Sequence, residues 1–351
     1  MKKEIRDFIL CQYERYPEMQ IQDMLKALHQ SEFGCGHFVG DGAAAYLDEE
    51  LKGLVPAEGD TIEPLYGDFV RVHLRILQQT GLSKETLLRI FTLSGSREYS
   101  STAGIEEKID ILTELVRERK LPFSAKDFQI AVDEWRKAGF PLRRHTEPFR
   151  EKYHPAYRVV HKSYAKYIEL FSAIDKLMRQ RSRIIIALEG GSASGKSTLG
   201  DMLSEVYDCN LFHMDDFFLR PEQRTPERFA EVGGNVDYER FFTEVLSPLS
   251  RGESIAYRRY NCSTQTVEPA EMIAPKQLNI IEGAYSLHPM LKDSYDMRVF
   301  MRISPELQRA RIEKRNPPFL QKRFFEEWIP LENVYFEQTQ PWKMCDLVFD
   351  E

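Results

Sequence analysis

A glycine-rich segment near the middle of the chain has the spacing of a phosphate-binding loop. It reads G-x-x-x-x-G-K-S over residues 190–197 and follows the apolar run 184–188. Glycines let the backbone curl with its N–H groups pointing inward, which makes an anion nest where a helix begins. The lysine of such a motif reaches β- and γ-phosphate oxygens, and the hydroxyl after it ligates Mg²⁺.

The alternative is an ordinary glycine-serine turn, and the strand predicted before the segment argues against it. We therefore expect this loop to bind a nucleoside triphosphate, with Ser197 also on the metal. The residues of the predicted phosphate loop are Gly190, Gly191, Ser192, Ala193, Ser194, Gly195, Lys196, Ser197 and Thr198.

Three acids follow apolar runs that read as strands. Asp215 and Asp216 come directly after residues 211–214, and Glu282 ends the run 278–281. In open parallel sheets ligands bind at the carboxyl edge of the strands. A carboxylate there accepts the proton of an acceptor hydroxyl or holds the metal, and Glu282 is placed to reach Mg²⁺ directly or through water. The alternative for the aspartate pair is a solvated turn.

Basic residues gather in the predicted helix over residues 305–315. Arg311 and Arg315 lie one turn apart on one face and could close over a triphosphate to stabilise transition-state charge. The alternative is a solvated basic face. A cradle, a metal site, a base and mobile cations are together the parts that phosphoryl transfer needs.

The order of these segments resembles the uridine kinase and phosphoribulokinase family of P-loop kinases, with nicotinamide riboside kinases as close relatives. The resemblance covers residues 183–351 and is carried by GGSASGKS at 190–197, DDFF at 215–218, IIEG at 280–283 and the arginine-bearing helix. It implies a kinase that uses ATP and Mg²⁺ to phosphorylate a hydroxyl of a nucleoside-like small molecule. It also implies that Asp215 is the general base, and that Asp237 grips ribose hydroxyls, since a carboxylate accepts two hydrogen bonds from a diol.

The hairpin segment 257–262 departs from the uridine kinase pattern. Family members carry Tyr-Asp-Phe followed by a histidine, whereas this chain has Arg258 and Arg259 after Tyr257, and Cys262 further on. We expect Tyr257 and Arg259 to contact the acceptor. Two arginines there favour an acidic or phosphorylated sugar-like acceptor over a nucleoside, unless they point to solvent.

Two further points concern the nucleotide. The N-K-x-D motif of GTPases does not follow the phosphate loop, which favours ATP as donor. An ATP-dependent sensor that acts through the N-terminal half is a rival to the kinase, but nucleotide binding alone needs no base at Asp215.

The elements that must position these residues alternate between strand and helix in the second half. Strands are expected near residues 184–188, 211–214, 278–281, 297–303 and 347–349, and helices near 196–207, 238–249 and 305–315. This alternation predicts an α/β domain with a parallel sheet flanked by helices, and we assign it to residues 179–351.

Residues 1–178 read as a mostly α-helical domain of unknown role. Ile105, Ile109, Leu112 and Val116 form a helical stripe. Helices are expected near 2–16, 20–31, 42–54, 83–94, 125–138 and 163–179. Such a domain could bind a regulator, recognise the acceptor or build a homo-oligomer.

Two groups in this half have more than one interpretation. His29, Cys35 and His37 are close in sequence, but three ligands without a fourth make a glycine-rich turn a better interpretation than a metal site. A polar and aromatic cluster suits a ligand pocket or an interface, although such clusters more often pack one helix on another. It consists of His145, Tyr153, His154, Tyr157 and Arg158.

Composition places limits on the partners. The length of 351 residues is enough for two domains. The net charge of −7 lies in residues 182–351, which hold 20 basic and 27 acidic residues, so neither half is a basic nucleic-acid surface. Five scattered cysteines and the lack of a long apolar run favour a cytoplasmic protein. We expect a small-molecule hydroxyl acceptor as partner, and neither nucleic acid nor membrane.

Overall fold

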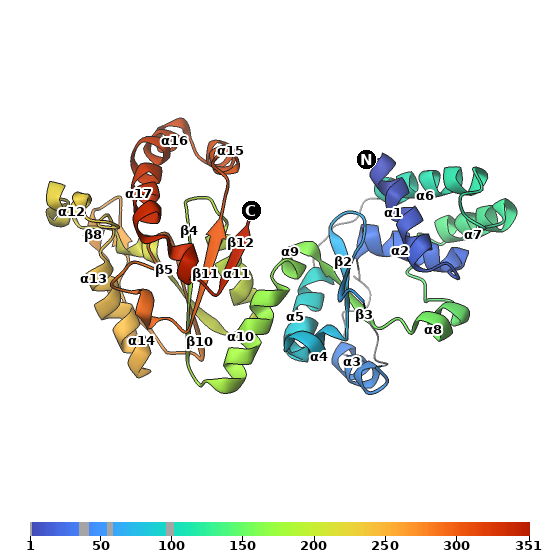
Figure 1. Ribbon diagram of the computed structural model, residues 1–351, viewed down its shortest axis with the longest axis horizontal. Coiled ribbons are helices and arrows are strands. Elements are labelled where there is room, and N and C mark those ends of the chain that lie inside the picture. Colours follow the sequence, from blue (N-terminus) through green and yellow to red (C-terminus); the bar gives the residue numbers. More distant parts are fainter. Residues whose placement is uncertain (1, 35–41, 55–58, 96–101) are drawn as a thin grey trace. The chain divides into compact units, whose positions relative to one another are not determined.

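The structure of the protein is a computed structural model, and it describes residues 2–34, 42–54, 59–95 and 102–351. The chain divides into two compact units, Met1–Lys176 and Leu177–Glu351, here called the N-terminal and the C-terminal unit (Figure 1). Each unit has an apolar cluster of its own, as expected of a domain.

A parallel sheet of five strands forms the centre of the C-terminal unit (Figure 1). Its order is β12-β11-β4-β10-β5, so the first strand in sequence, β4, lies in the middle. Every residue of β4 is buried, as expected for a strand covered on both faces. The predicted parallel sheet flanked by helices is therefore confirmed. The strands are β4 (Ile184–Gly190), β5 (Cys209–His213), β10 (Leu278–Glu282), β11 (Met297–Arg302) and β12 (Leu347–Asp350).

Helices cover this sheet. The first of them, α11, packs against β4, β5 and β10. The apolar cluster of the unit joins Ile185 and Phe212 of the sheet to Phe241 and Leu249. The helices are α11 (Lys196–Val206), α12 (Pro226–Ala230), α13 (Tyr238–Phe241), α14 (Ser247–Arg251), α15 (Pro305–Arg315), α16 (Pro318–Arg323) and α17 (Ile329–Thr339).

Shorter elements complete the C-terminal unit. The helix predicted over residues 238–249 is α13 and α14 joined by a π-helical turn at 242–246, and a second such turn at 324–328 joins α16 to α17. The predicted hairpin falls in a segment with two small antiparallel pairs: β6 (Ile255–Tyr257) with β9 (Glu271–Ile273), and β7 (Tyr260–Asn261) with β8 (Thr266–Val267). Single 3₁₀ turns lie at 214–217, 221–223, 292–294 and 341–344.

The N-terminal unit is mostly helical, as predicted. The stripe predicted from Ile105 to Val116 is buried in α6, and Ser124 caps α7 by accepting from the amide of Asp127. The helices are α1 (Lys2–Arg15), α2 (Ile21–Phe33), α3 (Ala43–Lys52), α4 (Ile76–Thr80), α5 (Lys84–Gly95), α6 (Thr102–Arg117), α7 (Ala125–Lys137), α8 (Glu147–Tyr153), α9 (Lys162–Ala165) and α10 (Ile168–Gln180).

Two features of this unit differ from the sequence-based expectation. A three-stranded antiparallel sheet is present, made of β1 (Ile62–Pro64), β2 (Phe69–His73) and β3 (Tyr157–His161). The helix expected over residues 163–179 is α9 and α10, separated at residues 166–167. The strands have at most five residues each, and such short runs are hard to tell from helical ones by periodicity.

A buried polar network lies between this sheet and the first helices. Arg71 donates to Glu63 over 2.8 Å, and it also donates to Gln12 and Gln30. His145 contacts Asp23 through Nδ1 at 2.9 Å and the Tyr157 hydroxyl through Nε2 at 2.7 Å. The predicted polar and aromatic cluster is thus in part a packed, hydrogen-bonded core, since His145, Arg71 and Glu63 are all buried.

The metal alternative of this unit receives no support from the described part of the chain. His29 is buried and packs against Phe33, whereas Cys35 and His37 lie outside the described residues. No group of three or more His, Cys, Asp or Glu side chains that could hold a metal occurs within the described ranges. None of the helices described is long and apolar enough to span a membrane.

Candidate active site

The predicted phosphate loop connects the end of β4 to the start of α11. Gly190 and Gly195 have φ angles of 152° and 97°, which side-chain-bearing residues rarely adopt. At Gly190 a Cβ would lie 2.4 Å from the carbonyl oxygen of Met301, so space also demands glycine there. Ala193 has a positive φ of 60° as well. The loop therefore has the curled backbone at a helix N-terminus that an anion nest requires.

Polar side chains of the loop suit an anion. Lys196 is buried, and its Nζ donates to the carbonyl of Gly191 over 2.9 Å. The Oγ of Ser194 is buried and has no hydrogen-bond partner among the described residues. Ser197 and Thr198 are exposed where α11 begins. Phosphate oxygens would accept from these groups, so the residues present fit a triphosphate.

Side chains of two later helices bind the same loop. Gln308 of α15 donates to the carbonyl of Ser192 over 2.8 Å. Glu332 of α17 accepts from the amide of Ser192 at 2.8 Å and from its hydroxyl at 2.6 Å. Burial raises the pKa of Glu332. Sequence reasoning missed both side chains, because nothing in their local sequence marks a contact with a loop more than 100 residues away.

The two predicted arginines of α15 lie in different environments. Arg311 donates to the carbonyl of Ala193 over 3.0 Å and forms an ion pair with Glu351 at 2.8 Å. Arg315 is exposed and makes no hydrogen bond or ion pair with any residue that the structure describes. Arg311 is thus docked on the loop, whereas Arg315 remains available to a ligand.

The candidate metal ligands lie at the carboxyl edge of the sheet. Both carboxylate oxygens of Glu282 lie 3.2 Å from the Ser197 hydroxyl. His213 stands opposite Glu282 in the parallel register of β5 and β10, and its Nδ1 lies 2.6 Å from the carboxylate. The hydrogen bond with Glu282 raises the pKa of His213. A hydroxyl and a carboxylate side by side are the oxygen donors that Mg²⁺ prefers, so these residues fit the metal.

His213 is a site residue to which sequence reasoning gave no role. The signal was present, because His213 and Glu282 each end an apolar strand, and those strands are neighbours in the sheet. Carboxylates that bind a metal are themselves held in place by hydrogen bonds, and His213 supplies such a contact to Glu282.

The acids after β5 point in different directions. Asp215 keeps a solvent-exposed side chain, so a ligand can reach it. Surrounding protein nevertheless desolvates the carboxyl group and raises its pKa, which the charge of Lys196 opposes. Asp216 instead accepts from the hydroxyl of Tyr257 at 2.6 Å and lies 3.5 Å from the Arg259 guanidinium.

Residues of the hairpin segment are engaged within the protein. Tyr257 is buried in the apolar cluster of the unit, with its hydroxyl on Asp216. Arg258 forms an ion pair with Glu244. Arg259 binds Glu271 at 2.9 Å besides Asp216. Each of the two arginines therefore forms at least one ion pair with a carboxylate of its own unit.

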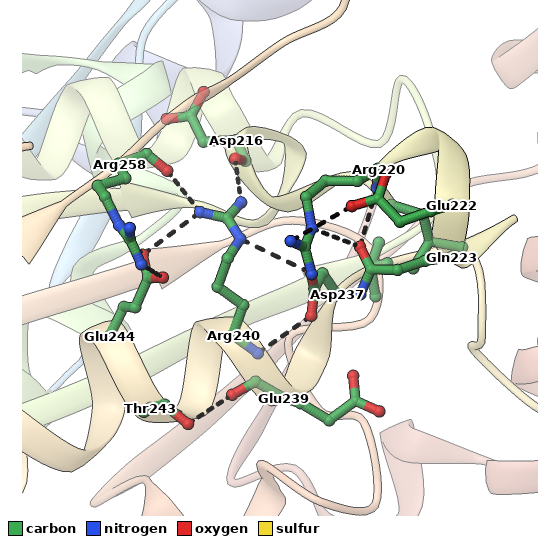
Figure 2. A network of polar contacts seen from close by, with 12 residues as sticks. Asp216, Arg220, Glu222, Gln223, Asp237, Glu239, Arg240, Thr243, Glu244 and Arg258 are labelled. Carbon is green, nitrogen blue, oxygen red and sulfur yellow. Dashed lines mark hydrogen bonds and ion pairs between the residues drawn. The ribbon is translucent and has the colours of Figure 1, made fainter. Parts of the chain in front are cut away.

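Asp237 is buried where α13 begins. One carboxylate oxygen caps the helix by accepting from the amide of Arg240 at 3.1 Å. The side chain of Arg240 reaches the carbonyls of Asp216 and Arg258, as Figure 2 shows. Asp237 is thus tied, through Arg240, to the segment that carries Asp215 and Asp216.

Glu189 is a second residue that sequence reasoning missed. It is fully buried at the end of β4 and accepts from the amides of Gly190, Tyr285 and Leu287 and from the hydroxyl of Tyr335. Desolvation raises its pKa to about 7. An acid inside an otherwise apolar strand run was the available signal. Through these hydrogen bonds, Glu189 links Gly190, the first residue of the phosphate loop, to the turn that follows Glu282.

Comparisons with known proteins agree with this geometry. The model of the phosphoribulokinase / uridine kinase family matches residues 185–316. Uridine kinase-like protein 4 of Arabidopsis thaliana is 29% identical over 147 residues, which are 39% of this chain and 31% of that protein. The phosphoribulokinase of Synechocystis is 27% identical over 134 residues, 36% of this chain and 39% of that protein. The matches therefore span about a third of each relative's length.

A solved structure described as a possible uridine kinase from Bacillus stearothermophilus covers 52% of this chain and 100% of its own, at 22% identity and a TM-score of 0.39. The family match includes the phosphate loop, Asp215, Glu282 and α15. Over these residues the chain is similar to the phosphoribulokinase / uridine kinase family, and its C-terminal unit has the parallel sheet flanked by helices that was expected of a P-loop kinase domain.

Proposed function

We propose that the C-terminal unit transfers the γ-phosphoryl group of ATP to a hydroxyl group of a small molecule. The observation that carries this proposal is that Lys196, Asp215 and Glu282 gather at one edge of the sheet, close enough for the other two charges to act on the pKa of Asp215. A phosphate cradle, a metal site and an exposed base are the parts that phosphoryl transfer requires.

Each part has a named residue in this proposal. Lys196 and the loop amides hold the phosphates. Mg²⁺ bound by Ser197 and Glu282 would neutralise negative charge on the transferring group. Asp215 accepts the proton of the acceptor hydroxyl, and its raised pKa makes it a stronger base than an ordinary aspartate. Arg315, which has no partner among the described residues, supplies a cation from α15.

The acceptor is inferred to be neutral. Arg258 and Arg259, which would favour an acidic or phosphorylated acceptor, are already paired with Glu244, Asp216 and Glu271. The resemblance to uridine kinases favours a nucleoside-like molecule, and a nucleoside is one neutral compound with several hydroxyls. The proposed acceptor is therefore a neutral compound with a hydroxyl group, and no nucleoside base is assigned to it.

A test of the base uses Asp215→Asn, which keeps the shape of the side chain and removes its basicity. We expect the rate of acceptor-dependent ADP release to fall by about 100-fold or more, the usual contribution of a general base, while ATP binding is unchanged. Asp208→Asn, at an exposed aspartate paired with Lys276, is the matched control. If Asp215→Asn keeps the wild-type rate, the assignment of the base is wrong.

The cradle is tested by Lys196→Ala, which removes the buried ammonium. ATP affinity and turnover should both fall, measured by calorimetric titration and by ADP release. If ATP binds the wild-type chain but no small hydroxyl compound stimulates ADP release, the sensor is favoured over the kinase.

A further inference from the structure

Three hydrogen-bonded side chains form a relay in the N-terminal unit, to which the proposed kinase reaction assigns no role. Nδ1 of His145 lies 2.9 Å from the carboxylate of Asp23, and its Nε2 lies 2.7 Å from the hydroxyl of Tyr157. Asp23 and His145 are buried, whereas Tyr157 is partly exposed. The relay therefore begins at a tyrosine on the edge of the core and ends at a fully buried carboxylate.

The positions of the protons in the relay follow from the charges of its members. Burial alone would raise the pKa of Asp23, but hydrogen bonds from His145 and Thr146 lower it, so the carboxylate is charged and only accepts. Nδ1 of His145 must then carry the proton. Burial lowers the pKa of His145 to about 4, so the ring is neutral near pH 7 and its Nε2 accepts from the Tyr157 hydroxyl. The order of hydroxyl, imidazole and carboxylate is the one that activates a hydroxyl for acid–base chemistry.

Tyr157 is also held from a second side. Gln30 donates to its hydroxyl oxygen over 3.2 Å, and the buried guanidinium of Arg71 lies 4.9 Å from the centre of its ring. Burial raises the pKa of Tyr157, and the charge of Arg71 opposes this shift. A hydroxyl that donates to His145 and accepts from Gln30 keeps one lone pair, which can accept a proton from a ligand.

A lysine without a partner stands beside the relay. Lys26 shares one face of α2 with Asp23 and Gln30, because residues three and four apart are neighbours on a helix. It is partly buried and makes no hydrogen bond or ion pair with any residue that the structure describes. Asp23 is not free to pair with it, because each of its two oxygens already accepts two hydrogen bonds.

The charges that act on Lys26 are mainly positive. The cations among them are Arg71, Arg144 and Arg150. Burial and these cations lower the pKa of Lys26 to about 8, and Asp23 opposes them. Arg150 pairs with Glu147 at 3.1 Å, whereas the exposed side chain of Arg144 has no partner in the described part of the chain. Since buried charges in proteins are paired, a partly buried ammonium among cations points to a negatively charged ligand.

We propose that the N-terminal unit holds a second ligand site, which takes a small molecule with a phosphate or carboxylate group and exchanges a proton with it. Lys26 binds the anionic group, and Tyr157 is the group that takes or returns the proton. When the Tyr157 oxygen accepts a proton from the ligand, its own proton moves to Nε2 of His145. The charge of Asp23 then stabilises the imidazolium. This site is independent of the phosphoryl transfer proposed for the C-terminal unit.

Pyridoxal 5′-phosphate tests the lysine, because this probe combines an aldehyde with a phosphate. The aldehyde forms an imine with an uncharged amine and releases water, and borohydride reduces the imine to a stable amine. Peptide mapping by mass spectrometry, with Mg-ATP present, compares Lys26 with Lys126, an exposed lysine of α7 without a partner in the described ranges. We expect Lys26 to be labelled at least about 10-fold faster, because its lowered pKa leaves more of the amine uncharged.

Inorganic phosphate and malonate distinguish the two anionic groups. Each is titrated into the labelling reaction at constant ionic strength. We expect at least one of them to slow the labelling of Lys26 by about 10-fold, as it would if a bound anion raised the pKa of Lys26 by about one unit, and to leave Lys126 unchanged. Protection by phosphate alone assigns a phosphate ester, and protection by malonate alone assigns a carboxylate. Labelling of Lys26 that is no faster than that of Lys126, or that neither anion slows, overturns the proposal.

The relay is tested by NMR of the imidazole nitrogens of His145, assigned with His145→Gln. We expect the tautomer with a proton on Nδ1 near pH 7. The protecting anion should move the ¹⁵Nε2 resonance in wild type, because a ligand on Tyr157 changes the hydrogen bond that Nε2 accepts. It should not move that resonance in Tyr157→Phe or Lys26→Met, whereas Lys126→Met should behave as wild type. A proton on Nε2, or a resonance that the anion leaves in place, would show that Tyr157 is only a structural neighbour and would overturn its role.

Discussion

Glu189 connects three parts of the active site through one carboxylate. Its oxygens take amide hydrogens from Gly190, Tyr285 and Leu287 and a hydroxyl hydrogen from Tyr335. Such a buried acid is held charged by its donors and pushed towards the neutral form by desolvation, and here desolvation is the stronger effect, so its pKa is about 7. The Glu189 carboxyl group therefore changes its protonation state near neutral pH.

The pH dependence of stability follows from the sign of this shift. Because the folded pKa lies above the ordinary value of 4.5, the folded state binds more protons between pH 4.5 and 7. Stability from this group is complete below about pH 4.5 and falls as the pH rises to about 7, by roughly 3 kcal/mol at most. Glu189→Gln removes the carboxyl group and with it this pH dependence of stability. In thermal unfolding at several pH values, the Tm of Glu189→Gln minus the Tm of wild type should therefore rise with pH. Parallel pH profiles would contradict the assignment.

Single residues could be predicted where the motif is contiguous in sequence. Lys196 and Ser197 follow from the spacing of the loop, and Asp215 and Glu282 from the ends of apolar strands. Glu332 and Arg240 could not be found in this way. Their partners are 140 and 24 residues away in the chain, and only the folded backbone decides that they meet.

Among the elements, α15 carries two arginines that we expect to have different roles. Arg311 is held by Ala193 and Glu351, and Arg315 is free of partners in the described chain. We expect Arg311→Ala to raise the KM for ATP, because it loosens the phosphate loop. Arg315→Ala should instead lower kcat by about 10-fold or more, because it removes charge from the transferring group.

Steady-state kinetics with varied ATP separates the two effects. Lys314→Ala, at the exposed lysine beside Arg315, controls for loss of positive charge on the helix. Equal changes of KM and kcat in Arg311→Ala and Arg315→Ala would show that the helix acts as a single cationic face.

Strands could be predicted from the sequence where their burial produces a continuous run of apolar residues. Strands β4 and β10 are continuous apolar runs because both faces of the sheet are covered. In the N-terminal unit, β2 and β3 carry Arg71, His73 and Arg158 among their apolar residues. Charged residues that are buried by pairing with other segments break the pattern, so this sheet was not expected.

On the scale of the whole molecule, each unit has its own apolar cluster, and the phosphate loop belongs to one of them. We therefore expect Mg-ATP to stabilise one unfolding transition and leave a second unchanged. At a hundredfold excess of ATP over its Kd the shift should be roughly 5–10 °C. Differential scanning calorimetry measures both transitions, and Lys196→Ala should remove the shift. A single transition that moves as a whole would show that the units unfold together.

The buried polar network of the N-terminal unit has a consequence for how the chain reaches its fold. Asp23 and Gln30 lie in α2, but their partners His145, Thr146 and Tyr157 come more than 100 residues later. During synthesis from the N-terminus, α2 is therefore made long before these late partners, and a half-finished unit would bury Asp23 and Gln30 with only part of their hydrogen bonds. The N-terminal unit therefore cannot complete this network before residue 157 has been synthesised, and contacts of such high sequence separation slow its folding.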